Sequence, residues 1–201
     1  MNELEAFTED MDKICEMSDE WNLSPEEFYK EFTKMCMKYS SDSMIPYSLC
    51  AEMIAEGYAY EKYHMQMLMY VYSHYNVGED FLELLQILID DGDCADYQKK
   101  THELIKDYIQ EGYVIAYRGE FATKDQGNLD YKQSVSYSLD YEEAKFFATR
   151  FKMLPLTKSV VYTVKVPVND VLAHIERENE VVCLPICMGG KMEVIKKESF
   201  V

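Results

Sequence analysis

Three glutamates at alternate positions precede an apolar run close to the C-terminal end of this 201-residue sequence. They are Glu176, Glu178 and Glu180, and the run 181–184 that follows (Val-Val-Cys-Leu) is typical of a buried strand. Because side chains alternate between the two faces of a strand, this spacing predicts all three carboxylates on one face. Carboxylates gathered beside an apolar strand are costly unless a ligand or a proton uses them. The pattern could therefore serve catalysis, and the alternative is a solvated edge with ordinary surface charge.

Two upstream segments contain residue types that bind anions or hydrogen-bond a carboxylate. Arg118 ends an apolar run and is followed by Gly119, so a planar guanidinium could reach a phosphate where a ligand can approach the backbone. Ser136 and Ser138 alternate on a short strand predicted over 134–138. Taken singly, the arginine could equally form a surface ion pair and the serines an ordinary strand edge.

The first half of the chain carries helical signals. The segment 24–27 (Ser-Pro-Glu-Glu) combines an N-cap serine, a proline at the first helical position and a glutamate three residues after the cap, which predicts a helix start. Apolar residues at helical spacing predict helices over 7–15, 28–36, about 47–75, 81–89 and 94–109.

The second half carries strand signals. Strands are predicted over 113–117, 134–138, 159–166, 180–184 and 191–196, with a polar loop at 121–130 and a short connection at 169–177. Asp140 is predicted to cap a helix that carries Phe147 and Arg150. Helices followed by strands indicate an α+β fold. The length suits one domain, 1–201, with a helical part at 1–112 and a strand-rich part at 113–201.

The net charge and the cysteine content indicate which partners and which cellular compartment to expect. The net charge of −17 disfavours nucleic acid and anionic membranes as partners. Six cysteines without a CxxC pair favour buried, reduced thiols and a cytoplasmic, reducing location. Cys183 and Cys187 lack a nearby His or Cys, so no metal site is expected. The acidic first five residues are unlike a signal peptide, and no apolar run is long enough to predict a membrane span.

The sequence resembles mono-ADP-ribosyltransferases, which carry an arginine, a serine motif and a glutamate motif in this order. The matching residues here are Arg118, Ser136-x-Ser138 and Glu178-x-Glu180-Val. The sequence is similar to the enzymatic components of bacterial binary toxins and to arginine-specific vertebrate enzymes. The resemblance runs from about residue 113 to the C-terminus. It implies an ADP-ribosyltransferase-like fold, in which a helical half precedes a mixed, mostly antiparallel two-sheet β core.

The resemblance also implies a substrate, NAD, and residues that would hold it. Arg118, with Gly119, matches the arginine that holds the phosphate and ribose region of NAD. Ser136 opens the Ser-x-Ser motif, closed by Ser138, and would position the catalytic glutamate. Two further matches are Phe147, an aromatic on the nicotinamide ribose side, and Arg150, a second cation toward the phosphates.

The same resemblance implies the catalytic roles. Glu180 matches the catalytic glutamate, which would stabilise the positive charge that develops on the ribose. Glu178 matches a residue that is also glutamate in arginine-modifying members, and it would activate the acceptor. The implied reaction moves ADP-ribose from NAD to a target protein, with arginine the favoured acceptor. The protein would act in the cytoplasm of the cell that makes it or, as a delivered toxin or effector, in a host cytosol.

Several alternatives stay open at this point. Tyr137 stands where Thr is common, and Ser134 precedes Ser136 at the same spacing, so the serine register could slip by two residues. No aromatic target-reading residue precedes Glu178; His174 or Ile175 stands there instead. The same site could transfer ADP-ribose to water, as an NAD glycohydrolase. The chain could also be a non-catalytic binding or interaction module whose glutamates are surface charge.

Overall fold

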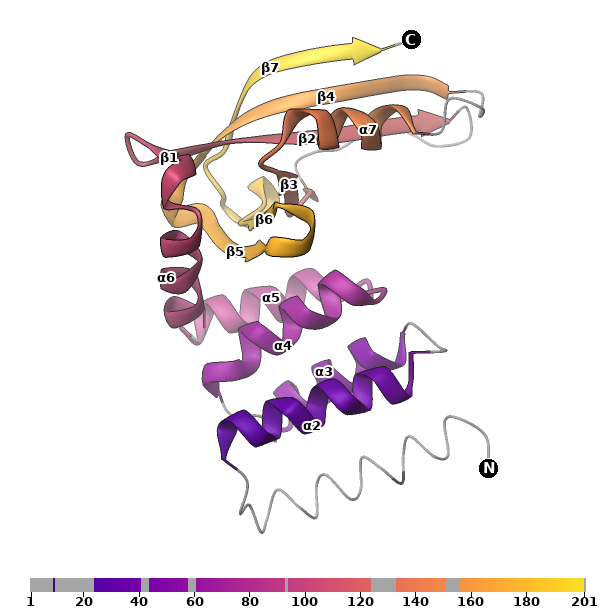
Figure 1. Cartoon of the computed structure of the whole chain (residues 1–201), viewed down its shortest axis with the longest axis vertical. Helices are drawn as coiled ribbons and strands as arrows, with labels where there is room; N and C mark the ends of the chain where they lie inside the picture. Colours follow the sequence, from indigo (N-terminus) through magenta and orange to yellow (C-terminus); the bar gives the residue numbers. More distant parts are fainter. Residues whose placement is uncertain are drawn as a thin grey trace. The chain divides into compact units, whose positions relative to one another are not determined.

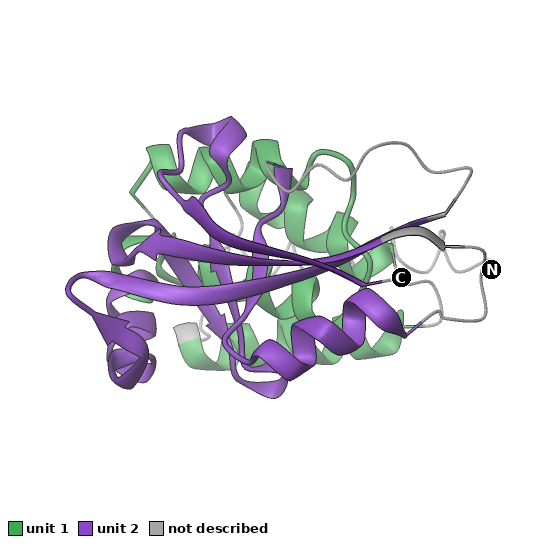
Figure 2. Ribbon diagram, turned by 90° about the horizontal axis from the view of Figure 1, so that it is seen from above, with its two compact units in different colours: residues 1–97 green, residues 98–201 purple. Residues whose placement is uncertain are grey.

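The computed structural model describes residues 24–40, 44–57, 61–92, 94–123, 133–150 and 156–200, together with residue 9. The helix predicted over 7–15 lies outside these ranges. The chain divides into two compact units, residues 1–97 and 98–201 (Figure 2). The boundary falls within helix α6 (Ala95–Leu104).

Four helices lie wholly in the described part of the first unit: α2 (Pro25–Lys38), α3 (Ile45–Ala55), α4 (Glu61–His74) and α5 (Phe81–Asp90) (Figure 1). Helices α3 and α4 pack on each other, and α2 packs on both. The apolar stripe of α2 is buried there, and Phe32 and Cys36 are each at most 1% exposed. Amphipathic helices thus bury their apolar faces against one another, as the 3.6-residue period predicts.

The predicted start of α2 is confirmed in detail. The Ser24 hydroxyl accepts a hydrogen bond from the Glu27 backbone N–H at 3.3 Å, and Glu27 Oε2 accepts one from the Ser24 N–H at 2.8 Å. The two residues therefore satisfy two of the helix's free N–H groups reciprocally.

Ser24→Ala is expected to destabilise the first unit by about 1 kcal/mol, because alanine cannot accept that hydrogen bond. Thermal unfolding measured by circular dichroism checks this result. Ser24→Asp is the matched control, since it keeps a capping oxygen and should melt close to the native chain. Equal destabilisation by both variants would contradict the capping role.

Two helix predictions in this half were wrong in extent. The segment predicted over about 47–75 is two helices, α3 and α4, and the chain turns after α3 at Gly57, which has a φ of 72°. The helix predicted over 94–109 ends at Leu104 and is followed by a 3-10 turn, η1 (Lys106–Tyr108).

A seven-stranded sheet forms the second unit. The strands are β1 (Ile109–Gln110), β2 (Tyr113–Thr123), β3 (Ser136–Ser138), β4 (Leu156–Pro167), β5 (Val171–Ile175), β6 (Glu180–Cys183) and β7 (Glu193–Phe200). Their order is β5-β6-β3-β2-β4-β7, with β1 paired to β2, and every pairing of the described strands is antiparallel. The coarse α+β prediction, helices first and strands after, is confirmed.

The implied two-sheet core is not what the strands form. A pairing between Tyr117 on β2 and Ser138 on β3 joins the short strands β3, β6 and β5 to the long strands β2, β4 and β7. The two groups of strands are therefore one hydrogen-bonded sheet, linked where β2 and β3 meet.

Strand bounds also differ from the predicted ones. The region predicted as a loop from Phe121 begins as strand, because β2 continues to Thr123 opposite β4. The short connection predicted over 169–177 contains β5, which pairs with β6. Strand β3 begins at Ser136 rather than Ser134. The last strand runs over 193–200, later than the predicted 191–196.

Alternation along β4 separates two apolar layers. Val160, Tyr162 and Val164 pack in the larger core with residues of β2, β3 and β6. Val161 points the other way and packs against helix α7 (Tyr141–Thr149). Helix α7 lies along β2 and β4 (Figure 1). One face of the long strands thus carries the main core and the other carries α7.

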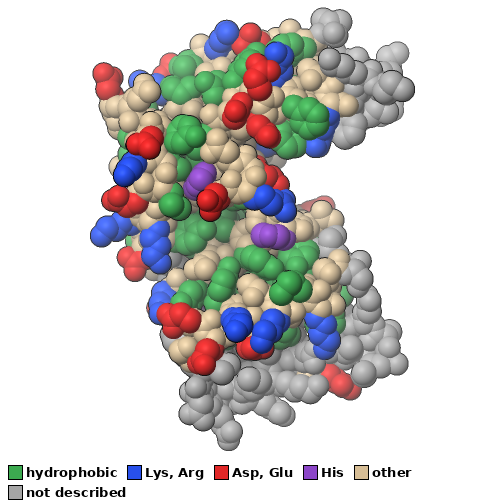
Figure 3. All heavy atoms as spheres, viewed as in Figure 1, with side chains coloured by type: hydrophobic (Ala, Val, Ile, Leu, Met, Phe, Trp, Pro, Cys, Tyr) green, Lys and Arg blue, Asp and Glu red, His purple; other side chains and the backbone are tan. Residues whose placement is uncertain are grey.

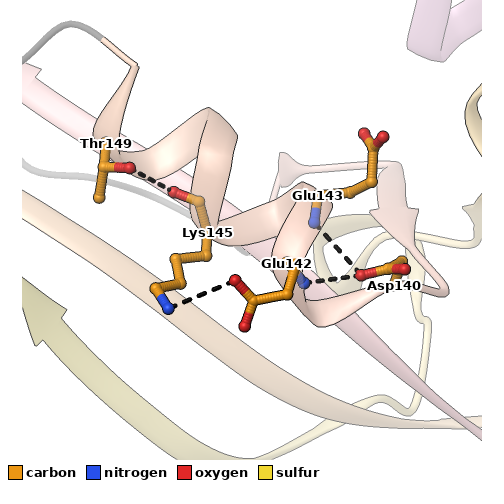
Figure 4. A network of polar contacts seen from close by, with 5 residues as sticks. All are labelled: Asp140, Glu142, Glu143, Lys145 and Thr149. Atoms are coloured by element: carbon orange, nitrogen blue, oxygen red, sulfur yellow. Dashed lines mark hydrogen bonds and ion pairs between the residues drawn. The ribbon is translucent and has the colours of Figure 1, made fainter.

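The predicted cap of α7 is confirmed (Figure 4). Asp140 Oδ1 accepts hydrogen bonds from the backbone N–H groups of Glu142 at 2.7 Å and Glu143 at 3.3 Å. Later in the helix, Lys145 pairs with Glu142 at 3.3 Å, and its carbonyl accepts a hydrogen bond from the Thr149 hydroxyl at 2.8 Å. An aspartate cap fixes where the helix leaves β3, and this determines how α7 meets β2.

Most cysteines with a described position are buried, as predicted. Cys36, Cys50, Cys94 and Cys183 are buried and Cys187 is exposed, whereas Cys15 lies outside the described ranges.

Acidic and basic side chains are interspersed on the face in Figure 3. Among the helices that the structure describes, none has the length and apolar character needed to cross a membrane.

Candidate active site

The strand order places three of the predicted site residues together. Strand β3 lies between β2 and β6, so Ser136 is next to both Arg118 on β2 and Glu180 on β6. In the ladder, Ser138 lies opposite Glu180, and Ser136 lies opposite Val182. Ser136 is therefore the diagonal neighbour of Glu180 on the same face. The Ser136 hydroxyl forms a hydrogen bond with the Glu180 carboxyl.

Pairing with β6 also distinguishes between the two serine registers. Ser134 precedes β3, and its hydroxyl donates to Glu120 Oε1 at 3.2 Å. Ser138 Oγ accepts a hydrogen bond from the Asp140 N–H at 3.0 Å, within the turn before α7. Of the three serines, Ser136 is thus the one with a hydrogen bond to the Glu180 carboxyl.

Arg118 is held between two partners. Its Nη1 donates to the Ser136 carbonyl oxygen at 3.1 Å, and its Nε lies 3.5 Å from Glu120 Oε1. The side chain remains 34% exposed, so part of the guanidinium can meet a ligand. Arg118 Nε and Glu120 Oε2 are buried without a hydrogen-bond partner in the described structure.

The Glu180 carboxyl lies in an environment that disfavours its charge. Burial raises its pKa above the ordinary 4.5, and the negative charge of Glu178 raises it further. The Ser136 hydrogen bond and the positive charge of Arg118 act in the opposite direction. Arginine, serine and both glutamates thus form one electrostatic unit, in which each partner adjusts the proton affinity of Glu180.

Ser136→Ala is expected to raise the pKa of Glu180 further, because a hydrogen bond that favours the ionised form is lost. Carboxyl titration by NMR, with the Glu180 signal assigned through Glu180→Gln, measures the effect. Ser134→Ala is the matched control. The Ser134 hydroxyl donates to Glu120 and not to Glu180, so its loss should not change the pKa of Glu180. An unchanged pKa in Ser136→Ala would contradict the hydrogen bond.

The prediction that Glu176, Glu178 and Glu180 share one strand face was wrong. Glu176–Glu178 form a 3-10 turn, η4, and Asn179 follows in the left-handed region with φ 45° and ψ 46°. Strand β6 begins only at Glu180. The turn leaves Glu176 exposed and brings Glu178, itself 37% exposed, into electrostatic contact with Glu180.

Gly119 has a structural role that the sequence did not indicate. A Cβ on this residue would lie 1.7 Å from the Ala144 carbonyl oxygen and 2.9 Å from the Ala148 nitrogen. The glycine therefore allows α7 to lie directly on β2. Its proposed contact with a cofactor stays a prediction.

Phe147 and Arg150 form a pair on and just after α7. The Arg150 guanidinium carbon lies 4.7 Å from the centre of the Phe147 ring, within the range of a cation–π contact. Helix α7 packs on the face of β2 to which Gly119 belongs, whereas Arg118 points to the opposite face. The participation of this pair in a site with Arg118 stays a prediction.

Two site neighbours were missed from the sequence, Glu120 and Asn179. Glu120 is two residues after Arg118 on one strand face, a spacing that could have indicated their pairing. Asn179 precedes the strand in a conformation that asparagine tolerates better than most residues. His174 Nε2 lies 3.4 Å from Asn179 Oδ1. Ile175 is only 8% exposed, so of the two residues before Glu178 considered for target reading, His174 is the more accessible.

Among the described residues, no three His, Cys, Asp or Glu side chains gather as a metal site would require. No protein-family model matches the sequence, and comparisons with curated proteins and with solved structures likewise find no match.

Proposed function

We propose that this chain is an NAD-dependent mono-ADP-ribosyltransferase, which moves ADP-ribose from NAD to a protein acceptor and releases nicotinamide. One observation carries the proposal. Arg118, Ser136 and Glu180 come from three neighbouring strands: the Ser136 carbonyl accepts a hydrogen bond from Arg118, and the Ser136 hydroxyl, with the charges of Arg118 and Glu178, acts on the half-buried Glu180 carboxyl. The resemblance predicted these residues as a functional set from their order alone.

The chemistry requires a carboxylate of this kind. Breaking the bond between ribose C1′ and the nicotinamide nitrogen develops positive charge on the sugar, as in glycoside hydrolysis. A carboxylate fixed against the sugar stabilises that charge more than it stabilises the ground state. The Ser136 hydrogen bond orients Glu180 for this role, and burial concentrates its electrostatic effect.

Substrate binding needs cations in an otherwise acidic protein. Arg118 presents a partly exposed guanidinium next to Glu180, with a geometry suited to a phosphate. The buried Nε faces Glu120 Oε1 at 3.5 Å, so a phosphate would contact the exposed part of the side chain rather than this atom. Phe147 and Arg150 are included in the NAD site on the resemblance alone.

Glu178 supports a guanidinium acceptor. Its carboxylate is close to Glu180 and partly exposed, so an arginine from a target protein can reach it. A carboxylate there would hold the guanidinium and take its proton as the new bond forms. In the same structure Arg177 Nη2 lies 2.5 Å from Glu178 Oε1, so an external arginine must displace Arg177. Until it does, water can react at ribose C1′, which supports NAD glycohydrolysis as the second function.

The test is incubation of the purified chain with NAD labelled in its ADP-ribose half, with and without a cell lysate. Nicotinamide release and label on protein are measured separately. Glu178→Gln should retain nicotinamide release and lose transfer, because it removes the group that activates the acceptor. Glu176→Gln is the matched control, an exposed glutamate on the same turn, and should change neither. Absence of nicotinamide release and of NAD binding by the native chain would overturn the proposal.

A further inference from the structure

We propose that Arg177 is an acceptor of the chain's own activity, so that the chain ADP-ribosylates itself at this residue. The inference rests on the proposed function and names an acceptor for the same site. It comes from the contact between Arg177 and Glu178, which places a guanidinium on the carboxylate that would activate an acceptor.

The contact joins the acceptor side of the site to its catalytic side. Arg177 Nη2 donates to Glu178 Oε1 at 2.5 Å. Glu178 in turn lies close enough to Glu180 for its negative charge to act on the Glu180 carboxyl. The Arg177 side chain is 61% exposed, so it can move within reach of a sugar held at Glu180.

Arg177 is the best placed of the chain's three arginines. Arg118 is held by the Ser136 carbonyl and Glu120, and Arg150 lies over the Phe147 ring at 4.7 Å. Arg177 has a guanidinium nitrogen on the Glu178 carboxylate, where proton removal is required.

Backbone hydrogen bonds close this turn and tie it to the segment that follows β3. The Asn179 N–H donates to the Glu176 carbonyl at 3.2 Å, and the Leu139 N–H donates to the Asn179 carbonyl at 2.9 Å. Because Arg177 is tethered three residues from Glu180, its side chain reaches a high effective concentration at the site.

The bonds and charges of the step balance without a further reactant. The bond between ribose C1′ and the nicotinamide nitrogen breaks, and nicotinamide leaves with the electron pair. A new bond forms between ribose C1′ and a terminal nitrogen of Arg177. The guanidinium loses one proton to Glu178, which releases it to solvent, and the modified guanidinium remains protonated.

The experiment uses the full chain with NAD and no other protein. Nicotinamide release is followed by chromatography, and the modified residue is located by peptide mass spectrometry with electron-transfer fragmentation. We expect one ADP-ribosyl group on the peptide that contains Arg177, removable by neutral hydroxylamine, as arginine linkages are. Its rate of formation per chain should not change on dilution, because the acceptor is in the same molecule.

Arg177→Lys keeps the positive charge, and it should lose this label. Glu176→Gln is the control on the same turn and should keep it. Free ADP-ribose can modify side chains by glycation without a catalytic site, so it is used in place of NAD as a control. We expect no label with free ADP-ribose, because the label should come from transfer out of NAD. Nicotinamide release without added mass, or label that persists in Arg177→Lys, would overturn this inference while the proposed function stands. Absence of nicotinamide release would overturn both.

Discussion

Glu180→Gln is expected to slow nicotinamide release from NAD by at least about 10²-fold, equivalent to about 3 kcal/mol of transition-state stabilisation. The amide keeps the size of the side chain and can still accept a hydrogen bond from Ser136. It cannot supply the negative charge that the ribose requires as its bond to nicotinamide breaks. Initial rates at saturating NAD measure the effect.

The same substitution should not lower stability, and at neutral pH it should raise it. The pKa of Glu180 is raised in the folded chain, so the folded state binds its proton more tightly than the unfolded state. Ionisation therefore costs folding free energy as the pH rises from the ordinary pKa of 4.5 through the folded pKa, and the full penalty is present above the folded pKa. Glutamine carries no charge and avoids this penalty.

Melting curves over a range of pH test this sign. Above the folded pKa, the melting temperature of Glu180→Gln should exceed that of the native chain, where about 1 kcal/mol corresponds to roughly 2–4 °C. The difference should vanish below the ordinary pKa of 4.5. Glu176→Gln, which removes an exposed charge, should match the native chain in rate and melting. An unchanged rate in Glu180→Gln would remove the catalytic assignment, and a lower melting temperature at neutral pH would contradict the effect of burial.

Features with local causes were predictable from the sequence. The capping box at Ser24 and the Asp140 cap each depend on residues within one helical turn. The middle of strand β4, 160–164, is a run of β-branched and aromatic residues, so its sequence predicts a strand without reference to a partner. The candidate set of Arg118, Ser136 and Glu180 was also named from sequence, by resemblance.

Features that depend on a distant partner were not predictable. Strand β5 has a short apolar segment, and its extended form is stabilised by pairing with β6. The choice of Ser136 over Ser134 depends on which serine faces Val182 across the ladder. The alternation of side chains along a strand predicted three carboxylates on one face. The chain instead forms a 3-10 turn at Glu176–Glu178 and a left-handed residue at Asn179, so the strand begins only at Glu180.

Gly119→Ala is expected to destabilise the second unit by about 3 kcal/mol or more, the upper end for overpacking. The new Cβ would lie 1.7 Å from the Ala144 carbonyl oxygen and 2.7 Å from its carbonyl carbon. Both atoms are backbone, so no side-chain rotation relieves the clash, and α7 must move away from β2. Because the Ser159 hydroxyl also donates to the Ala148 carbonyl on that helix at 2.6 Å, the shift would strain β4 as well.

Gly112→Ala is the control in the same unit. Its φ of 82° is strained for alanine, yet a Cβ there meets nothing within 4 Å, so it should cost only about 1 kcal/mol. Thermal and denaturant unfolding of the two variants separates a packing clash from the loss of a glycine. Where Gly119→Ala remains folded, displacement of β2 should also move Arg118 and slow nicotinamide release, which Gly112→Ala should not do. Equal melting temperatures of the two variants would mean that α7 does not pack on β2 this closely. Gly119 would then keep the role first predicted for it, which is to let a ligand approach the backbone beside Arg118.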